Sequence, residues 1–242
     1  MRKYVDINVD VGEGFGNELN IVPFVSSINL ACGGHAGDEL TIQSVLELAK
    51  KYRVRVGAHP GFEDRDNFGR VPLDISIDEL RESIRKQMDL IQFLAHQNGV
   101  SLSYIKPHGA LYHMVCNVGK YALLLTEFAQ EGMGLMGLPK SVLENVCIEQ
   151  GIDFIAEGFA DRVYETDGNL RKRSLKGSIH SSFDNLMAQV INLCNDKVSV
   201  FSNDLIELKV DSICFHGDHN NSGELIKKVV AELKKEGVEI RS

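Results

Sequence analysis

The sequence contains no tryptophan, only five prolines among 242 residues, and no long apolar run. A membrane-spanning helix needs about 20 consecutive, mostly apolar residues, so a membrane protein is not expected. The chain begins MRKYVDINVDVGEG, where acidic and amide side chains interrupt the apolar residues, and this pattern argues against a signal peptide. We therefore expect a cytoplasmic protein.

Basic charge and paired cysteines are also scarce. Lys and Arg together number 26 against 34 Asp and Glu, a formal net charge of -8, and no basic stripe interleaves with aromatic residues. Nucleic acid is therefore not an expected partner. The five cysteines form no CxxC pair, which argues against a disulfide framework or a zinc site and favours a role as small core residues.

Several catalytic motifs are absent. The chain has no GxSxG elbow, no GxxxxGK[ST] phosphate loop and no HExxH. It is therefore not expected to bind ATP by itself. Cys32 beside His35 is a conceivable nucleophile, but a thiol at the end of an apolar strand is more often inert. No low-complexity or Pro/Ser-rich linker divides the chain, so we expect one domain over residues 1–242.

Short apolar, β-branched runs alternate with stripes of helical periodicity along the whole chain. Ser76 and Glu79 are spaced as a capping box for the longest helix, Gly99 stands at its expected end, and Asp38 is placed to cap the helix before it. Such alternation predicts parallel strands joined by crossover helices, and the length fits a closed barrel better than an open sheet. The strand candidates are 5–9, 27–30, 54–56, 102–105, 135–138, 154–156, 198–201 and 213–215.

Polar residues gather where these predicted strands end. In a parallel β/α barrel all strand ends meet at one face, so scattered motifs can form one pocket. On the first strand, Asp6, Asn8 and Asp10 alternate with apolar residues, and Glu13 follows them. The carboxylates of Asp10 and Glu13 suit a metal ion or a general base. The alternative is a hydrogen-bonded network that braces the barrel interior.

Three histidines follow three different strands. His35 lies in a glycine-rich loop able to bring backbone N–H groups to an anion, and His59 precedes a proline. In the stretch YIKPHGALY, a strand ends in Lys106 and His108. There a lysine can stabilise developing negative charge while the imidazole moves protons. The structural alternative pairs Lys106 with an inner aspartate.

Two long connections, 61–75 and 158–180, are rich in Gly, Asp and Arg. Loops of this length in a compact domain are usually functional or mobile. They carry Arg70 and Arg162, whose guanidinium groups suit a carboxylate or a phosphate. The competing interpretation is a solvated loop with internal ion pairs.

The last predicted strand is followed by FHGDH, residues 215–219. His216 repeats the pattern of a histidine and a glycine after a strand, and Asp218 is available to a metal ion or a basic group. A surface turn would explain the same residues.

Six stretches together, DINVDVGEGFG, NLACGGHAGD, GAHP with FGR, KPHGALY, FADRVYETDG and HGD, resemble the LamB/YcsF family in order and spacing over nearly the whole chain. The resemblance implies an irregular seven-stranded β/α barrel similar to the glycoside hydrolase/deacetylase superfamily. It also implies the A subunit of a bacterial ATP-dependent 5-oxoprolinase, which works with subunits B and C. Together they open the lactam of 5-oxoproline (pyroglutamate) to L-glutamate while ATP, a co-substrate, is hydrolysed.

Within that expectation the candidate residues form three groups. The catalytic candidates are Asp10, Glu13, His59, Lys106 and His108; the substrate-binding candidates are Asn8, His35, Arg70, Arg162 and His216; a divalent metal ion, if one is used, is assigned to Asp10, Glu13 and His59. Two other functions remain open at this stage. One is a metal-dependent deacetylase of a carbohydrate or small amide that needs no ATP, and the other is a non-catalytic subunit that binds 5-oxoproline.

Overall fold

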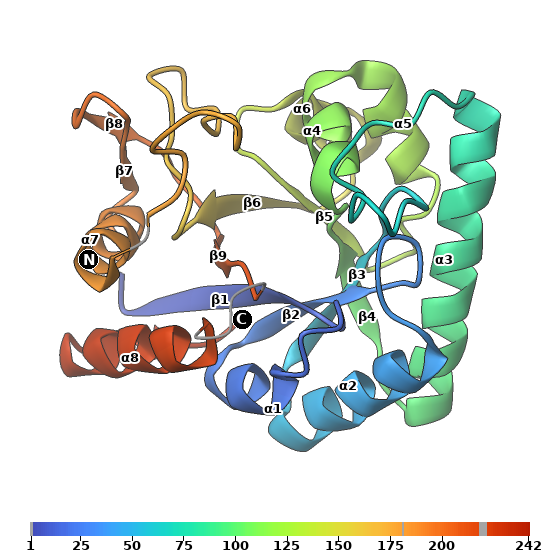
Figure 1. The fold of residues 1–242 in the computed structure, drawn as a ribbon, viewed down its shortest axis with the longest axis horizontal. Coiled ribbons are helices and arrows are strands. Elements are labelled where there is room, and N and C mark those ends of the chain that lie inside the picture. Colours follow the sequence, from blue (N-terminus) through green and yellow to red (C-terminus); the bar gives the residue numbers. More distant parts are fainter. Residues whose placement is uncertain (1, 181, 218–221) are drawn as a thin grey trace.

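A computed structural model describes residues 2–180, 182–217 and 222–242. Its centre is a closed barrel of parallel strands in the order β1-β2-β3-β4-β5-β6-β9, which closes because β9 pairs with β1 (Figure 1). The predicted seven-stranded β/α barrel is confirmed. The barrel strands are β1 (Tyr4–Val11), β2 (Ser27–Ala31), β3 (Arg55–His59), β4 (Leu102–Ile105), β5 (Gly134–Gly137), β6 (Phe154–Phe159) and β9 (Ser212–Phe215).

Helices surround the barrel, and the long helix α3 stands along one side of it (Figure 1). Among the described helices, none has the length and apolarity needed to cross a membrane. The helices are α1 (Glu18–Ile21), a 3-10 turn (Val22–Phe24), α2 (Glu39–Tyr52), α3 (Ile77–Asn98), α4 (Gly109–Asn117), α5 (Gly119–Thr126), α6 (Val142–Gln150), α7 (Phe183–Leu193) and α8 (Ser222–Lys235).

The predicted helix ends are confirmed. The Asp38 side chain accepts a hydrogen bond from the Thr41 amide at the start of α2. Ser76 and Glu79 form the reciprocal capping box of α3, and Gly99 ends this helix in the left-handed conformation, φ 63°. Such a φ favours glycine because a side chain would be strained there.

One strand candidate lies outside the barrel. The run at 198–201 overlaps β7 (Lys197–Ser199), which pairs antiparallel with β8 (Leu205–Glu207) in a separate small sheet. Val198 and Val200 are buried in the apolar core, so the prediction of an apolar strand is confirmed. The prediction that this strand belongs to the barrel is wrong. A short C-terminal strand, β10 (Glu239–Ile240), pairs with the start of β1.

The barrel interior is polar. Along β1 the alternate residues Val5, Ile7, Val9 and Val11 are buried in the apolar core, whereas Asp6, Asn8 and Asp10 are buried in a hydrogen-bonded network. Strand side chains point alternately to opposite faces, which separates the two sets. The inner face of β1 therefore places charged side chains, such as Asp10, at the end of the barrel.

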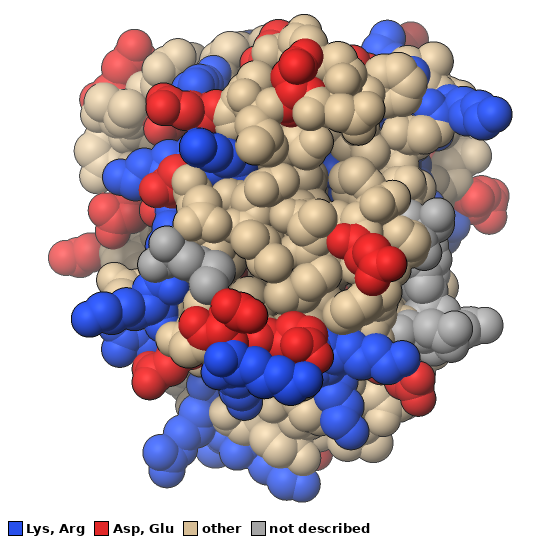
Figure 2. All heavy atoms as spheres, turned by 90° about the vertical axis from the view of Figure 1, so that its left-hand side faces the viewer, with Lys and Arg blue, Asp and Glu red and all other residues tan. Residues whose placement is uncertain are grey.

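Charges on the outer surface are mixed. On the face where α7 and α8 lie, Lys and Arg side chains are interspersed with Asp and Glu side chains (Figure 2). This face therefore has no uniformly basic surface of the kind that nucleic acid binding requires, as far as the described residues show.

Candidate active site at the carboxyl end of the barrel

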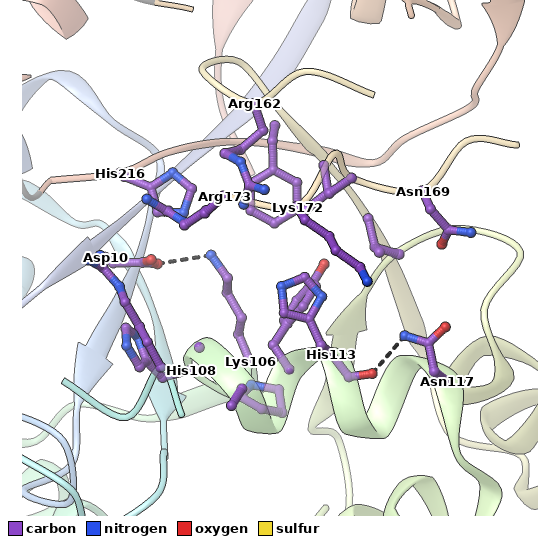
Figure 3. Close-up of a pocket in the computed structure, with 18 of the residues that line it drawn as sticks. Asp10, Lys106, His108, His113, Asn117, Arg162, Asn169, Lys172, Arg173 and His216 are labelled. Atoms are coloured by element: carbon purple, nitrogen blue, oxygen red, sulfur yellow. Dashed lines mark hydrogen bonds and ion pairs between the residues drawn. The ribbon is translucent and has the colours of Figure 1, made fainter. Parts of the chain in front are cut away.

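A cavity of ≈ 570 Å³ lies where the barrel strands end (Figure 3). Small-molecule sites in proteins have volumes of this order. Seven of the ten candidate residues line it: Asp10, His59, Arg70, Lys106, His108, Arg162 and His216. Glu13 and His35 lie immediately behind His59 and His108, so nine of the ten gather at one end of the barrel.

Lys106 forms the centre of the inner wall. Its ammonium group lies 2.8 Å from Oδ1 of Asp10 and 2.7 Å from Oε1 of Glu157, and it donates to Sγ of Cys214 at 3.1 Å. Burial alone lowers the pKa of Lys106, but the charge of Asp10, with Cys214 and Glu157, outweighs burial and holds it well above its usual value. Lys106 is therefore a permanent buried cation.

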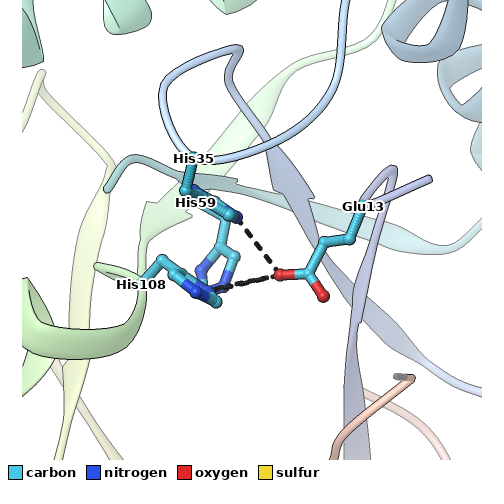
Figure 4. A group of neighbouring side chains, drawn as sticks. All are labelled: Glu13, His35, His59 and His108. Carbon is cyan, nitrogen blue, oxygen red and sulfur yellow. Dashed lines mark hydrogen bonds and ion pairs between the residues drawn. The ribbon is translucent and has the colours of Figure 1, made fainter. Parts of the chain in front are cut away.

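Behind the cavity, Glu13 faces three imidazoles (Figure 4). Its Oε1 lies 3.2 Å from Nε2 of His35, 3.8 Å from Nε2 of His59 and 3.2 Å from Nδ1 of His108. The ligand atoms of these four buried residues all lie within 4.8 Å of one another, so the group could hold a metal ion.

Backbone carbonyls determine which imidazole nitrogens face inward. Nδ1 of His59 donates to the Lys106 carbonyl at 2.6 Å, and Nε2 of His108 donates to the Phe68 carbonyl at 2.9 Å. In neutral rings, Nε2 of His59 and Nδ1 of His108 then both present lone pairs, 3.0 Å apart. Two lone pairs at this distance repel each other, and either a proton on one ring or a metal ion between the rings removes the repulsion. Metal-binding histidines are oriented by carbonyl groups in this way.

The pKa values of the cluster residues also favour a bound cation. Burial lowers the pKa of His59 to about 3 and that of His35 to about 4. For Glu13, burial acts in the opposite direction, but hydrogen bonds with His108 and His35 lower its pKa to about 2. At neutral pH the cluster thus contains a carboxylate and at least two neutral imidazoles, a donor set that suits a divalent cation.

The other candidates have clear positions. Asn8 lies deeper in the barrel, where its amide donates to Ser212 and its oxygen accepts from Asn29. It therefore belongs to the internal network and does not line the cavity. His216 lines the cavity and contacts the Asp161 carboxylate through Nδ1 at 2.8 Å.

Cys32 is unsuited to nucleophilic attack. It is buried, and burial raises the pKa of its thiol to about 12. It also accepts a hydrogen bond from the His59 amide. All five cysteines are buried and unpaired, as expected for core residues. Asp218, considered above as a metal ligand, lies outside the described residues.

Four prominent residues of the cavity region were not among the candidates: Glu157, Tyr112, Lys172 and Arg173. Glu157 directly follows the apolar run 154–156, and a carboxylate at such a position, like Asp10 on the first strand, indicates a site residue. Tyr112 closes the KPHGALY stretch, and burial, with Glu157 nearby, raises its pKa well above the usual value. Lys172 and Arg173 lie in the long connection that was noted for its basic residues, but no feature distinguished them from other loop cations.

Comparison with known proteins agrees with this picture. The sequence profile of the LamB/YcsF family matches residues 5–242. The chain is 36% identical to the A subunit of 5-oxoprolinase from Haemophilus influenzae (strain PittEE), over 98% of this chain and 99% of that protein. The same protein of Staphylococcus aureus (strain MSSA476) is also 36% identical, with coverage of 98% and 99%.

Solved structures extend the comparison to the fold. The lactam utilization protein from Thermus thermophilus matches with a TM-score of 0.89 and 33% identity, over 98% of this chain and 99% of that one. A GH113 beta-1,4-mannanase is similar in fold alone, with a TM-score of 0.50, 12% identity and coverage of 95% and 98%. Matches in sequence and structure over almost the full length show that the chain belongs to the LamB/YcsF family.

Proposed function

We propose that this chain is the A subunit of an ATP-dependent 5-oxoprolinase and contains the site at which the lactam ring of 5-oxoproline is opened. The observation that carries the proposal is the placement of the buried cation Lys106 beside the Glu13 and histidine cluster, at the base of one cavity. The names of the relatives at 36% identity support the same substrate and a complex with further subunits, which we take to be B and C. We place the complex in the cytoplasm, where ATP is available.

A lactam resists hydrolysis because amide resonance makes its carbonyl carbon a poor electrophile. Phosphorylation of the lactam oxygen by ATP, with the help of the partner subunits, removes that resonance and releases ADP. Water then adds to the ring carbon, the ring C–N bond breaks with its electron pair going to nitrogen, and the nitrogen takes a proton. A second water hydrolyses the resulting acyl phosphate to L-glutamate and phosphate.

The geometry suits this step. Lys106 offers a fixed positive charge where negative charge develops at the ring carbon's oxygen substituents. His59 and His108 border the cavity, so we assign proton transfer to them in the metal-free site; with an ion bound, they would hold the ion and its bound water would take this role. Asp10 is engaged by Lys106, which, against the effect of burial, lowers its pKa; we therefore assign Asp10 to orienting the lysine. Arg70 and Arg162 are assigned to the anionic groups of the substrate.

We assign the metal candidate site to Glu13, His35, His59 and His108. A divalent ion bound there would polarise the substrate or lower the pKa of a bound water. The inward lone pairs of His59 and His108 fit such an ion, whereas Asp10, Oδ2 of which is 3.6 Å from Nε2 of His59, stands at the edge of the group.

The test of function is glutamate formation from 5-oxoproline and ATP by the chain combined with its B and C partners. His108→Asn should reduce turnover by about 10²–10⁴-fold, the usual effect of losing a proton-transfer group. The matched control is His96→Asn, because His96 is exposed in the last turn of α3. Circular dichroism of both variants monitors folding. Full activity of a folded His108→Asn variant would remove this assignment.

The metal assignment is tested on the chain alone, since ATP itself requires a divalent ion. Elemental analysis after dialysis should find about one divalent ion per chain, and a chelator should lower the melting temperature because bound metal stabilises the folded state. Glu13→Gln should abolish both effects. The assignment would be contradicted if the purified chain contained no divalent ion and its melting temperature did not change when a chelator was added.

The same cluster favours a second function, a metal-dependent deacetylase that acts on a carbohydrate or small amide without ATP. That alternative predicts acetate release by the chain alone once metal is supplied. If 5-oxoproline binds normally and the complex remains fully active after substitution of Glu13 and His108, the chain would be a non-catalytic binding subunit.

A further inference from the structure

The outer part of the cavity carries more positive charge than a substrate with one carboxylate requires. The chain has a net charge of -8, yet the cavity lining contains five Lys or Arg residues and one acidic residue, Asp10. Lys106 is compensated by Asp10 and Glu157. Three further cations that line the cavity are Arg162, Lys172 and Arg173.

Arg162 is built into the wall in a fixed orientation. It is only 3% exposed, and its guanidinium group donates to the carbonyls of Arg171 at 2.6 Å and Ser178 at 3.4 Å. Burial, reinforced by the nearby charge of Arg173, lowers its pKa to about 10. In the part of the chain that the structure describes, no carboxylate forms an ion pair with Arg162, Lys172 or Arg173. The charge of Asp161, which pairs with His216, acts on Arg162 in the opposite direction to burial. A buried guanidinium without an ion-paired carboxylate of its own favours binding of an anion.

Three of the cations come from one segment. Arg162, Lys172 and Arg173 belong to the connection after β6 and project into the cavity from the side opposite α4, where His113 and Asn117 lie (Figure 3). Lys106 occupies the inner wall below them. The cavity therefore has a compensated cation at its base and a separate group of cations at its outer wall.

We propose that Arg162, Lys172 and Arg173 form a phosphoryl-binding subsite, which holds the phosphate group of a phosphorylated lactam while the ring is opened at the base of the cavity. The assignment of the lactam rests on the proposed function. A phosphoryl group carries up to two negative charges and three acceptor oxygens, which matches a cluster of three cations better than a carboxylate does. The triphosphate of ATP is the other possible source of such a group.

Calorimetric titration of the full chain with inorganic phosphate, acetate and ATP tests the subsite without any partner subunit. We expect phosphate to bind more tightly than acetate, and Arg173→Gln and Lys172→Gln each to weaken phosphate binding by at least about tenfold. Lys176→Gln is the matched control, because Lys176 is an exposed residue of the same loop that does not line the cavity and its substitution removes the same charge.

Equal weakening by all three substitutions, or equal binding of acetate and phosphate, would overturn the subsite. ATP binding far tighter than phosphate, and sensitive to the same two substitutions, would overturn the assignment to the lactam and identify the nucleotide as the ligand.

The complete complex supplies an independent readout. If the subsite retains the phosphorylated lactam, Arg173→Gln should raise the ratio of ATP consumed to glutamate formed, because the intermediate escapes and decomposes. Lys176→Gln should leave this ratio unchanged. Normal coupling in Arg173→Gln, together with unaltered phosphate binding, would remove the subsite and leave the proposed function standing. Phosphate binding with the expected pattern in a chain that forms no glutamate in the complex would instead remove the proposed function.

Discussion

At the scale of single residues, the site depends on one buried lysine between two buried carboxylates. The Lys106 side chain is almost inaccessible, as are Asp10 and Glu157. Buried ion pairs add little stability compared with apolar packing, but removing one partner leaves an uncompensated charge in the interior. The arrangement thus serves to hold charge where chemistry needs it.

We expect Lys106→Met to lower the free energy of unfolding by about 3–5 kcal/mol, because Asp10 and Glu157 are left facing each other without a cation. A second substitution, Glu157→Gln, should restore part of the loss. Urea denaturation followed by circular dichroism measures both effects, with the surface substitution Lys176→Met as control. Unchanged stability of Lys106→Met would contradict this account of the barrel interior.

Gly57 illustrates how tightly the interior is filled. A Cβ atom at Gly57 of β3 would lie 2.2 Å from the ring of Tyr104, whose hydroxyl donates to Ile28 and Asn29 and so holds the ring in place. Gly57→Ala should therefore cost about 1–3 kcal/mol of stability, as overpacking usually does. Gly119→Ala is the matched control, since its nearest neighbouring atom would be 4.0 Å away. Equal thermal midpoints for the two variants would refute the steric argument.

At the scale of elements, helix α3 connects the barrel exterior with the site. It buries Gln87, whose amide accepts from the Gly61 N–H at 3.0 Å and donates to the Gly61 carbonyl at 2.8 Å. This pair of hydrogen bonds holds the loop that follows His59. The helix therefore supports an active-site loop at a position well inside its length.

The N-terminal cap of α3 should matter for stability and not for turnover. Ser76→Ala removes the side chain that caps the Glu79 amide and should cost about 1 kcal/mol. The first turn would fray, while Gln87, three turns further on, keeps its contacts. Glu79→Gln should have a smaller effect, because glutamine also serves in a capping box. Thermal denaturation and the coupled glutamate assay separate the two effects; a large loss of turnover in Ser76→Ala would contradict the separation.

At the scale of the whole molecule, we expect residues 1–242 to unfold as one cooperative unit. β1 pairs with β2, β9 and β10, so the two ends of the chain are held in the same barrel wall. Urea transitions monitored by far-UV circular dichroism and by tyrosine fluorescence should coincide, as two-state unfolding requires. Separate midpoints would indicate that the chain contains more than one folding unit.

Much of the fold was predictable because local signals were strong. The capping box at Ser76, the cap at Asp38 and the alternation along β1 each depend on neighbouring residues, which the sequence displays directly. The run at 198–201 was assigned wrongly because an apolar strand looks the same inside a barrel and in a peripheral hairpin. Only its partner, β8, distinguishes the two.

The site was predictable as a set of residues but not as a geometry. His35, His59 and His108 were named because each follows a predicted strand, and their convergence on Glu13 depends on the barrel closing. The orientation of the imidazoles depends on backbone carbonyls at Lys106 and Phe68, which carry no signature in a sequence. The cations of the outer wall are equally hidden, since loop lysines and arginines are common.

The way β1 is paired also determines when this pocket can exist in the cell. During synthesis, β1 can acquire β9 as its neighbour only after residue 212 has been added, and β10 only after residue 239. Until β9 is present, the barrel cannot close around the carboxylates of β1 and Lys106. The chamber is consequently a late product of synthesis, and a chain that stops before residue 212 would lack the strand that closes it.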